Sequence, residues 1–140
     1  MQSLPEESEL FFIEDGQQLA SWGVLVSSTR NWALTEVNAQ LRSTRDFAAL
    51  ISFETAAEFR GRGLYPLLLA SMVDRIRTQT PGRETLIWCK RSNVASARGI
   101  TKAGFTEMAQ IYRRRPYGAL LVDEMVAGAL QSTSVSITNS

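Results

Sequence analysis

The sequence contains no histidine and a single cysteine, and both scarcities narrow its chemistry. Without imidazole, the chain lacks the commonest general base, the commonest metal ligand and a member of the serine triads. With only Cys89, it can form neither an intrachain disulfide nor a cysteine-rich metal site, which suits a reducing cytoplasm. If the protein is an enzyme, we expect its proton acceptor to be a carboxylate, a tyrosine or water, and we expect no metal.

Net charge and long apolar runs are also scarce. The 15 lysine and arginine residues nearly cancel the 14 aspartate and glutamate residues, so no overall field predicts binding to nucleic acid. No apolar run is long enough to span a bilayer, and the N-terminal MQSLPEESEL has the features of neither a signal peptide nor an anchor. We expect a cytoplasmic domain over residues 1–130, with no membrane partner, and a flexible polar tail over 131–140.

Apolar patterning predicts a mixture of strands and helices. Asp15-Gly16 is a strong hairpin signal between the apolar segments of residues 10–28. Residues 30–46 are left unassigned, because three apolar residues have helical spacing while Asn and Ser interrupt the flanks. The rest of the pattern predicts strands over 46–55, 84–89, 106–113 and 119–127, and helices over 64–78 and 93–102, the second ending at Gly104.

The segment EFRGRGLYPLLL, Glu58 to Leu69, joins a predicted strand to a predicted helix. A glycine-rich turn there exposes successive backbone N–H groups, and the first N–H groups of a helix have no partner within it. Gly61 and Gly63 let a ligand approach the backbone, and the arginines before and after Gly61 can contact its oxygens. The pattern indicates a phosphate site, although a surface turn with solvated arginines explains it equally well when it is taken alone.

A second motif follows in the right order. In the next predicted helix, N-V-A-S and K-A-G-F provide Asn93, Ser96, Lys102, Gly104 and Phe105. Together with Arg60 to Gly63, which match most of an R/Q-x-x-G-x-G/A pyrophosphate loop, they closely resemble the GNAT superfamily of acyl-CoA-dependent N-acetyltransferases. The resemblance covers roughly residues 9–127. A P-loop is excluded, because no G-K-S/T follows the glycines.

The resemblance implies an α+β fold with a central, mostly antiparallel sheet flanked by helices. Two neighbouring strands, 47–54 and 84–89, would diverge and leave a wedge for the pantetheine arm of acetyl-CoA, and N–H groups of the glycine loop would hold the pyrophosphate. For Asn93 an ordinary role as a helix cap is at least as good an interpretation. The residues that the resemblance assigns to the coenzyme are Ser52, Phe53, Thr55, Arg60, Gly61, Arg62, Gly63, Leu64, Tyr65, Asn93, Ser96, Arg98 and Lys102.

The reaction that the resemblance implies is direct attack of a neutral amine on the thioester. Glu54 is the first candidate for the base, because it ends the strand nearest the expected thioester and regular alternation would place it on the same face as Ser52. Glu58 is the second candidate. Each of the two also fits the interpretation of a solvated carboxylate with no role in the reaction.

Three departures from the family pattern bear on this interpretation. Ile100 stands where many members carry a tyrosine acid. Tyr112 or Tyr117 could replace it, but a strand aromatic packed in the sheet is the better interpretation of each, and a thiolate is also a tolerable leaving group without help. Tyr65 stands where glycine or alanine is usual. The third departure is that few residues precede the first strand, so the family's N-terminal strand and two helices, which line the acceptor pocket, are predicted to be reduced or absent.

If the acceptor wall is absent as predicted, three explanations are open. Residues 30–46 replace it, a second subunit of a homodimer supplies it, or the chain is a reduced domain; a dimer would also cover exposed edge strands. We predict an N-acetyltransferase that moves an acetyl group from acetyl-CoA to a primary amine of a small molecule or to an amino terminus. The alternative is a catalytically degenerate GNAT-like module that binds coenzyme A or a protein partner in a regulatory or scaffolding role.

Overall fold

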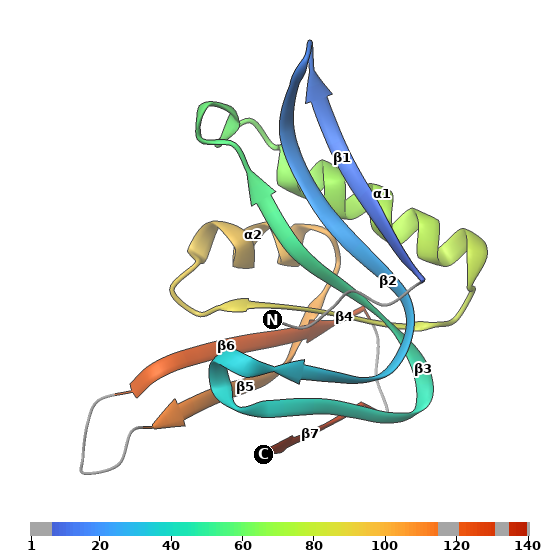
Figure 1. Cartoon of the computed structure of the whole chain (residues 1–140), viewed down its shortest axis with the longest axis vertical. Coiled ribbons are helices and arrows are strands. Elements are labelled where there is room, and N and C mark those ends of the chain that lie inside the picture. Colours follow the sequence, from blue (N-terminus) through green and yellow to red (C-terminus); the bar gives the residue numbers. More distant parts are fainter. Residues whose placement is uncertain (1–6, 115–120, 131–134, 140) are drawn as a thin grey trace.

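The computed structural model describes residues 7–114, 121–130 and 135–139, which form one sheet and two helices (Figure 1). Short 3-10 turns span Thr35–Val37 and Ala57–Phe59, and the second of them precedes the glycine loop. Within these residues, neither helix is long and apolar enough to cross a bilayer. The elements in chain order are β1 (Ser8–Asp15), β2 (Gln18–Leu34), β3 (Ala39–Thr55), α1 (Leu64–Gln79), β4 (Glu84–Lys90), α2 (Val94–Lys102), β5 (Thr106–Arg114), β6 (Leu121–Ala129) and β7 (Ser136–Asn139).

The strands lie in the hydrogen-bonded order β1-β2-β3-β4-β6-β5, and β7 pairs with β3. Neighbouring strands are antiparallel except β3 and β4, which run parallel because α1 carries the chain back between them. The predicted hairpin at Asp15-Gly16 joins β1 to β2, and Gly16 has the left-handed φ of 66° that its tight turn requires. This mostly antiparallel sheet with its two helices confirms the predicted α+β fold class.

The helices pack on one face of the sheet. Leu68 and Met72 of α1 are fully buried against Leu50 of β3 and Ile87 of β4, and Ile100 of α2 joins the same core. Burying one such side chain stabilises the fold by about 1.5–3 kcal/mol. The apolar stripe of α1 therefore fixes the start of this helix, and the glycine loop before it, against the end of β3.

The opposite face is covered by the sheet's own strands. β2 and β3 both bend, and their joined ends turn back toward β5 and β6 (Figure 1). The ring centroids of Trp32 in β2 and Trp88 in β4 are 6.3 Å apart. Leu41 of β3 packs in the same core as Leu86 and Met125. The sheet thus has a hydrophobic core on each face, and the second core needs no helix.

Residues 30–46, which the sequence analysis leaves unassigned, form the bent end of this hairpin. Leu34, Val37 and Leu41 are buried, but they come from β2, the 3-10 turn and β3. Their helical spacing arises because a tight turn brings both strands to the same core. Asn38 has a φ of 52° in this turn, a left-handed conformation that asparagine adopts more readily than most residues.

Residues 135–139, the described part of the flexible polar tail predicted over 131–140, pack with the rest of the fold. Residues Ser136–Asn139 form β7, which pairs with Ala39–Arg42 of β3, and Val135 is buried in the core. The prediction rests on the polar composition of the segment. The alternation of Val135 and Ile137 with serine and threonine is the strand signal that this composition conceals.

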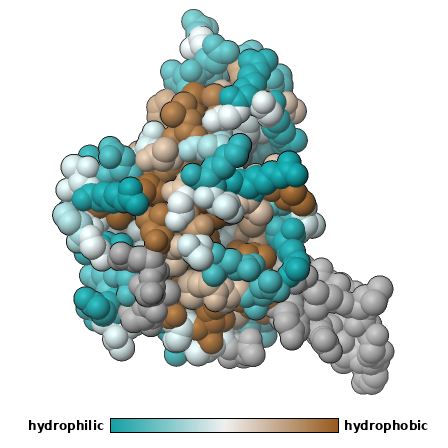
Figure 2. Space-filling model, turned by 180° about the vertical axis from the view of Figure 1, so that it is seen from behind, coloured by the Kyte–Doolittle hydropathy of each residue, from teal (hydrophilic) through white to brown (hydrophobic). Residues whose placement is uncertain are grey.

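The β1–β2 hairpin has a polar tip, and β1 also exposes large apolar side chains. Figure 2, which shows the molecule from behind, has hydrophilic residues at the top and hydrophobic residues emerging below them. Phe11 and Ile13 of β1 pack on the helix side, whereas the alternate residues Leu10 and Phe12 are 59% and 51% exposed. The strand therefore presents apolar side chains on both of its faces.

Candidate active site

β3 and β4 pair only along part of their lengths. Phe47–Leu50 pairs with Glu84–Ile87. Beyond this point Ile51–Thr55 pairs only with β2, and Trp88–Lys90 pairs only with β6. In the described part of the chain, no strand fills the gap between the two diverging ends. Backbone groups on the open side of β3 therefore face a space in which a ligand can satisfy them.

A β-bulge lies at the start of this open end. Ile51 pairs with Val24 and Glu54 pairs with Trp22, so that Gly23 alone faces two residues of β3. Ser52, one of these two, has a φ of 57°. The extra residue interrupts the alternation of faces. The reason for placing Glu54 on the face of Ser52 therefore does not hold, because that prediction assumed a regular strand.

Gly23 makes room for the bulge. A Cβ atom at this position would lie 2.4 Å from Cε1 of Phe53, closer than any real contact of this kind. With only hydrogen on Gly23, the Phe53 ring can lie over β2 and join the helix-side core. The pair of Gly23 and Phe53 thus fixes the direction of the chain just before it enters the cleft.

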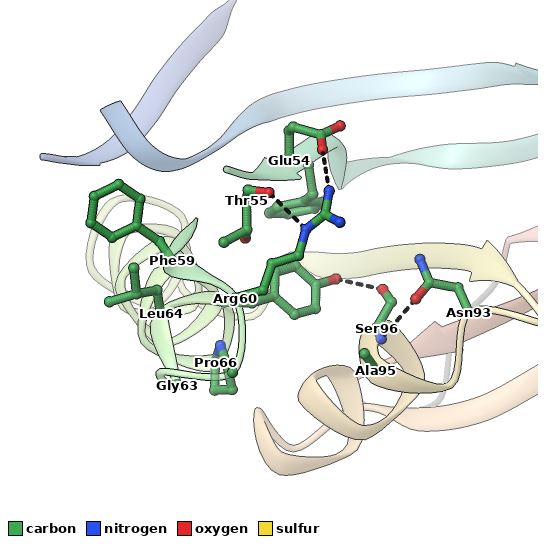
Figure 3. A pocket seen from close by; sticks show the side chains of 13 residues that line it. Glu54, Thr55, Phe59, Arg60, Gly63, Leu64, Pro66, Asn93, Ala95 and Ser96 are labelled. Atoms are coloured by element: carbon green, nitrogen blue, oxygen red, sulfur yellow. Dashed lines mark hydrogen bonds and ion pairs between the residues drawn. The ribbon is translucent and has the colours of Figure 1, made fainter. Parts of the chain in front are cut away.

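A cleft of about 560 Å³ opens where this strand end meets the two helices (Figure 3). It brings together the end of β3, the turn after it, the glycine loop and the first turns of α1 and α2. This is the volume of an ordinary small-molecule site. The lining residues are Phe53, Glu54, Thr55, Phe59, Arg60, Gly61, Gly63, Leu64, Tyr65, Pro66, Asn93, Ala95 and Ser96.

The glycine loop has the geometry of an anion site. Gly61 and Gly63 have φ values of 79° and 75°, and nothing lies within 4 Å of a Cβ atom placed on either residue. Gly63 is the N-cap of α1 and has no side chain with which to cap the helix. The first turn of α1 therefore lines the cleft without a side-chain cap, and the positive end of the helix dipole favours an anion there.

Arg60 is turned toward β3. Its Nε donates a hydrogen bond of 3.0 Å to the backbone oxygen of Thr55, and its Nη2 lies 3.3 Å from Oε1 of Glu54 (Figure 3). Both charged side chains are more than half exposed, so this ion pair contributes at most about 1 kcal/mol and can open at little cost. The ion pair thus places the carboxylate of Glu54 beside the guanidinium of Arg60 in the lining of the cleft. Arg62 lies elsewhere, over the ring of Phe59 and 5.1 Å from its centroid.

Tyr65 crosses the cleft from α1 to α2. Its hydroxyl lies 3.0 Å from Oγ of Ser96, and its ring packs edge-on against Phe53 with centroids 5.2 Å apart. Burial raises the pKa of the Tyr65 hydroxyl to about 12, although the hydrogen bond with Ser96 acts in the opposite direction. The hydroxyl is therefore protonated at neutral pH and can donate a hydrogen bond.

Asn93 and Ser96 shape the start of α2. Oδ1 of Asn93 accepts a hydrogen bond of 3.1 Å from the backbone N–H of Ser96, so Asn93 is the N-cap that the sequence predicts (Figure 3). Ile100, at the position of the missing tyrosine, is only 8% exposed and belongs to the core, so the cleft gains no acid from this position. Cys89 is also buried, and this burial raises the pKa of its thiol.

Most of the predicted coenzyme residues line the cleft, and so does Glu54, the first candidate for the base. The coenzyme residues that line it are Phe53, Thr55, Arg60, Gly61, Gly63, Leu64, Tyr65, Asn93 and Ser96. Ser52, Arg62, Arg98 and Lys102 do not line it, and neither does Glu58. The side chain of Tyr112 lies outside the described residues, as does Tyr117. Sequence analysis missed Phe59, Pro66 and Ala95, which stand beside the two motifs and could have been found from that neighbourhood.

Comparisons with known proteins agree with this geometry. Residues 30–114 match the family described as FR47-like protein. No curated protein sequence matches the chain. Among solved structures, an acetyltransferase from Bacillus subtilis in complex with CoA is 15% identical with a TM-score of 0.65, over 91% of this chain and 79% of that protein.

Two further structures have named acceptors. A ribosomal-protein-S18-alanine N-acetyltransferase from Escherichia coli is 16% identical with a TM-score of 0.62, over 91% of this chain and 70% of its own. A spermidine N-acetyltransferase from Vibrio cholerae is 14% identical with a TM-score of 0.63, over 89% and 66%. The family match and the shared fold together show that this chain belongs to the FR47-like family within the GNAT superfamily of acetyltransferases.

Proposed function

We propose that this protein transfers an acetyl group from acetyl-CoA to a primary amine of a small molecule or to an amino terminus. The observation that carries the proposal is the cleft in which an uncapped helix start, a left-handed glycine loop and an open strand edge meet. These features bind different parts of one ligand: a diphosphate, and an extended arm with amide groups. The related structure from Bacillus subtilis was solved with CoA, which supports this choice.

The diphosphate would bind at the glycine loop. The first turn of α1 lines the cleft and has no capping side chain, and no acidic residue in this turn opposes an anion. Because the Arg60 ion pair is exposed, its guanidinium can exchange the carboxylate of Glu54 for a phosphate oxygen. The loop therefore fits the charged end of acetyl-CoA.

The arm and its thioester would lie along the open end of β3. Ser52 and Phe53 have no partner in β4, and their backbone groups would pair with the amides of the arm, as a further strand would. An N–H group of the bulge directed at the thioester carbonyl would stabilise the negative charge that develops on its oxygen during attack. Oriented backbone donors supply this stabilisation without a metal or an imidazole.

Proton removal falls to Glu54 in this proposal. The attacking amine must be neutral, and the carboxylate at the cleft edge can accept its proton through a water molecule. Glu58 does not line the cleft, which favours Glu54 of the two candidates. The departing thiolate has an ordinary pKa near 8.5 and needs no strong acid, so Ile100 at position 100 does not prevent the reaction.

The alternative function is a degenerate module that binds coenzyme A or a protein partner without turnover. The observations in its favour are the burial of Ile100, where an acid is usual, and the position of Tyr65 inside the cleft. The two functions differ in one result. An enzyme releases free coenzyme A from acetyl-CoA only when a suitable amine is present, whereas a binding module takes up acetyl-CoA and leaves it intact.

Calorimetric titration with acetyl-CoA tests the proposal, with dephospho-CoA as the comparison ligand. Gly63→Val should weaken binding at least tenfold, because a branched side chain at a left-handed position distorts the loop and fills the ligand's approach. Gly82→Val is the matched control: Gly82 has a φ of 78° with the same open surroundings, but it does not line the cleft. Equal affinity in all three proteins, or no binding by the folded parent, would refute the assignment of the loop.

If the parent binds, an amine screen follows with release of the free thiol as the readout. Polyamines and peptides with free amino termini are the first compounds to test, because spermidine and an alanine residue of a ribosomal protein are the acceptors named for two related structures. If acetyl-CoA binds tightly but none of the amines tested causes release of the thiol, the degenerate module is favoured.

A further inference from the structure

The side chain of Tyr65 lies in the part of the cleft between β3 and α2, here called the inner part. Its ring touches Phe53 of β3, and its hydroxyl lies against Ser96 in the first turn of α2. These two neighbours stand on opposite sides of the space between the open strand and α2. A ligand arm that runs between Phe53 and Ser96 therefore meets the ring of Tyr65 in its path.

The ring of Tyr65 packs against Gly99 of α2, where the lack of a side chain leaves room for it. A Cβ atom on Gly99 would lie 2.6 Å from Cδ2 and 2.9 Å from Cε2 of Tyr65. Gly99 is buried inside a helix, where glycine costs about 1 kcal/mol relative to alanine. A large side chain in the first turn of α1, Tyr65, thus faces the smallest residue, Gly99, on α2. This fit places the ring between the helices and not in solvent.

The two parts of the cleft differ in their dependence on this ring. The loop part consists of Gly61, Gly63 and the first N–H groups of α1, which need no movement of Tyr65 to meet a diphosphate. The inner part consists of Phe53, Tyr65 and Ser96, and an arm enters it only if the ring leaves Ser96. The ring is held by its packing against Gly99 and the helix-side core, and by one hydrogen bond and one edge-on ring contact, each of modest strength.

We infer that Tyr65 is a specificity-determining residue of the cleft: its ring competes with the arm of an acyl-CoA for the space between β3 and α2, whereas the nucleotide diphosphate binds without this competition. The inference rests on the proposed function, because it assumes that acetyl-CoA is the ligand. It concerns binding only and requires no covalent step. It has one distinctive consequence: removing the ring of Tyr65, although this residue lines the cleft, should increase the affinity for coenzyme A and not lower it.

The experiment compares two probes by calorimetry: coenzyme A, and 3′-phospho-ADP, which is its nucleotide half without the arm. Tyr65→Ala should bind coenzyme A about tenfold more tightly than the parent, while its affinity for 3′-phospho-ADP should stay within about twofold. Tyr65→Phe and Ser96→Ala keep the ring but remove the hydrogen bond, and each should tighten coenzyme A binding by about two- to threefold. Leu67→Ala is the control, because Leu67 is an exposed residue of α1 that does not line the cleft.

The outcomes separate this inference from the proposed function. Weaker or unchanged coenzyme A binding by Tyr65→Ala, with normal binding of 3′-phospho-ADP, overturns the inference and leaves the proposed ligand in place. Binding of neither probe by the parent or by any variant overturns both. If Tyr65→Ala is too unstable to purify, the ratio of the two affinities in Tyr65→Phe and Ser96→Ala decides, and an unchanged ratio in both overturns the inference.

Discussion

The two halves of β3 differ in what they contact. Ala39–Arg42 and Phe47–Leu50 are paired on both sides, with β2 on one edge and with β7 or β4 on the other. Ile51–Thr55 is paired with β2 alone, contains the left-handed Ser52, and supplies three residues to the cleft. The first half builds both hydrophobic cores, and the second presents backbone groups and a carboxylate.

This difference shows how little separates a structural strand from a functional one. The same chain passes from core to cleft across a single bulged residue, because β4 diverges after Ile87 and leaves one edge of β3 open. Backbone groups that a ladder would otherwise satisfy become ligands for a bound molecule. Substitutions in the first half should therefore change stability, and substitutions in the second half should change binding or rate.

The largest effect on stability is expected in the paired half. Leu50 is 1% exposed between the sheet and α1, so Leu50→Ala should lower the free energy of unfolding by about 2–5 kcal/mol. Urea denaturation followed by circular dichroism measures this loss. The folded variant should bind acetyl-CoA like the parent, because Leu50 does not line the cleft. A parallel loss of affinity would mean that the two halves are not separable.

Glu54 tests the open half through the reaction rate. Glu54→Gln keeps the size of the side chain but removes the proton acceptor, so acetyl transfer to an amine identified in the screen should fall about 100-fold. Stability and acetyl-CoA affinity should change little, since the ion pair with Arg60 is exposed. Glu58→Gln is the comparison, and it should keep most of the activity because Glu58 does not line the cleft. Full activity of Glu54→Gln would discard Glu54 as the base.

Glycine substitutions compare the backbones of the two halves. Ala49 is fully buried in the paired half, and Ala49→Gly should lower the free energy of unfolding by about 1 kcal/mol or more. Ser52 has a left-handed φ of 57°, so Ser52→Gly relieves strain that offsets the greater freedom of glycine in the unfolded chain. We expect a change within about 0.5 kcal/mol for Ser52→Gly. A larger loss at Ser52 than at Ala49 would show that the bulge carries no such strain.

Local signals in the sequence were sufficient for the elements that carry the cleft. The hairpin at Asp15-Gly16, the helix that begins after Gly63 and the cap at Asn93 are each determined by residues within one turn of the feature. The same holds for the glycine loop that we propose as the diphosphate site, since its geometry follows from two glycines and a helix start. This is why most of the lining residues could be predicted.

Features that depend on distant residues could not be predicted in this way. The bulge at Ser52 depends on Gly23 across the strand pair, and the orientation of Tyr65 depends on the space at Gly99. Residues 30–46 show helical spacing because a turn folds two strands onto one core. Neither spacing nor composition reports such partners, since they meet only after the sheet has formed.

An effect that is absent at neutral pH is the shifted titration expected where the open half of β3 meets α2. Burial beside Phe53 raises the pKa of Tyr65 to about 12 in the folded chain, against the ordinary value near 10 in the unfolded chain. At pH 11 an ordinary tyrosine is about nine-tenths ionised, whereas Tyr65 should be about one-tenth ionised. Its contribution to stability is thus complete below pH 10 and is lost as the pH rises from 10 to 12, because the unfolded chain gives up this proton first. The difference in tyrosinate absorbance between the parent and Tyr65→Phe isolates this one hydroxyl among the three tyrosines, with circular dichroism of the same samples as the control for folding. A difference spectrum that is complete at pH 11 while the fold is intact would mean that the hydroxyl is in water and that the ring does not close the inner part of the cleft.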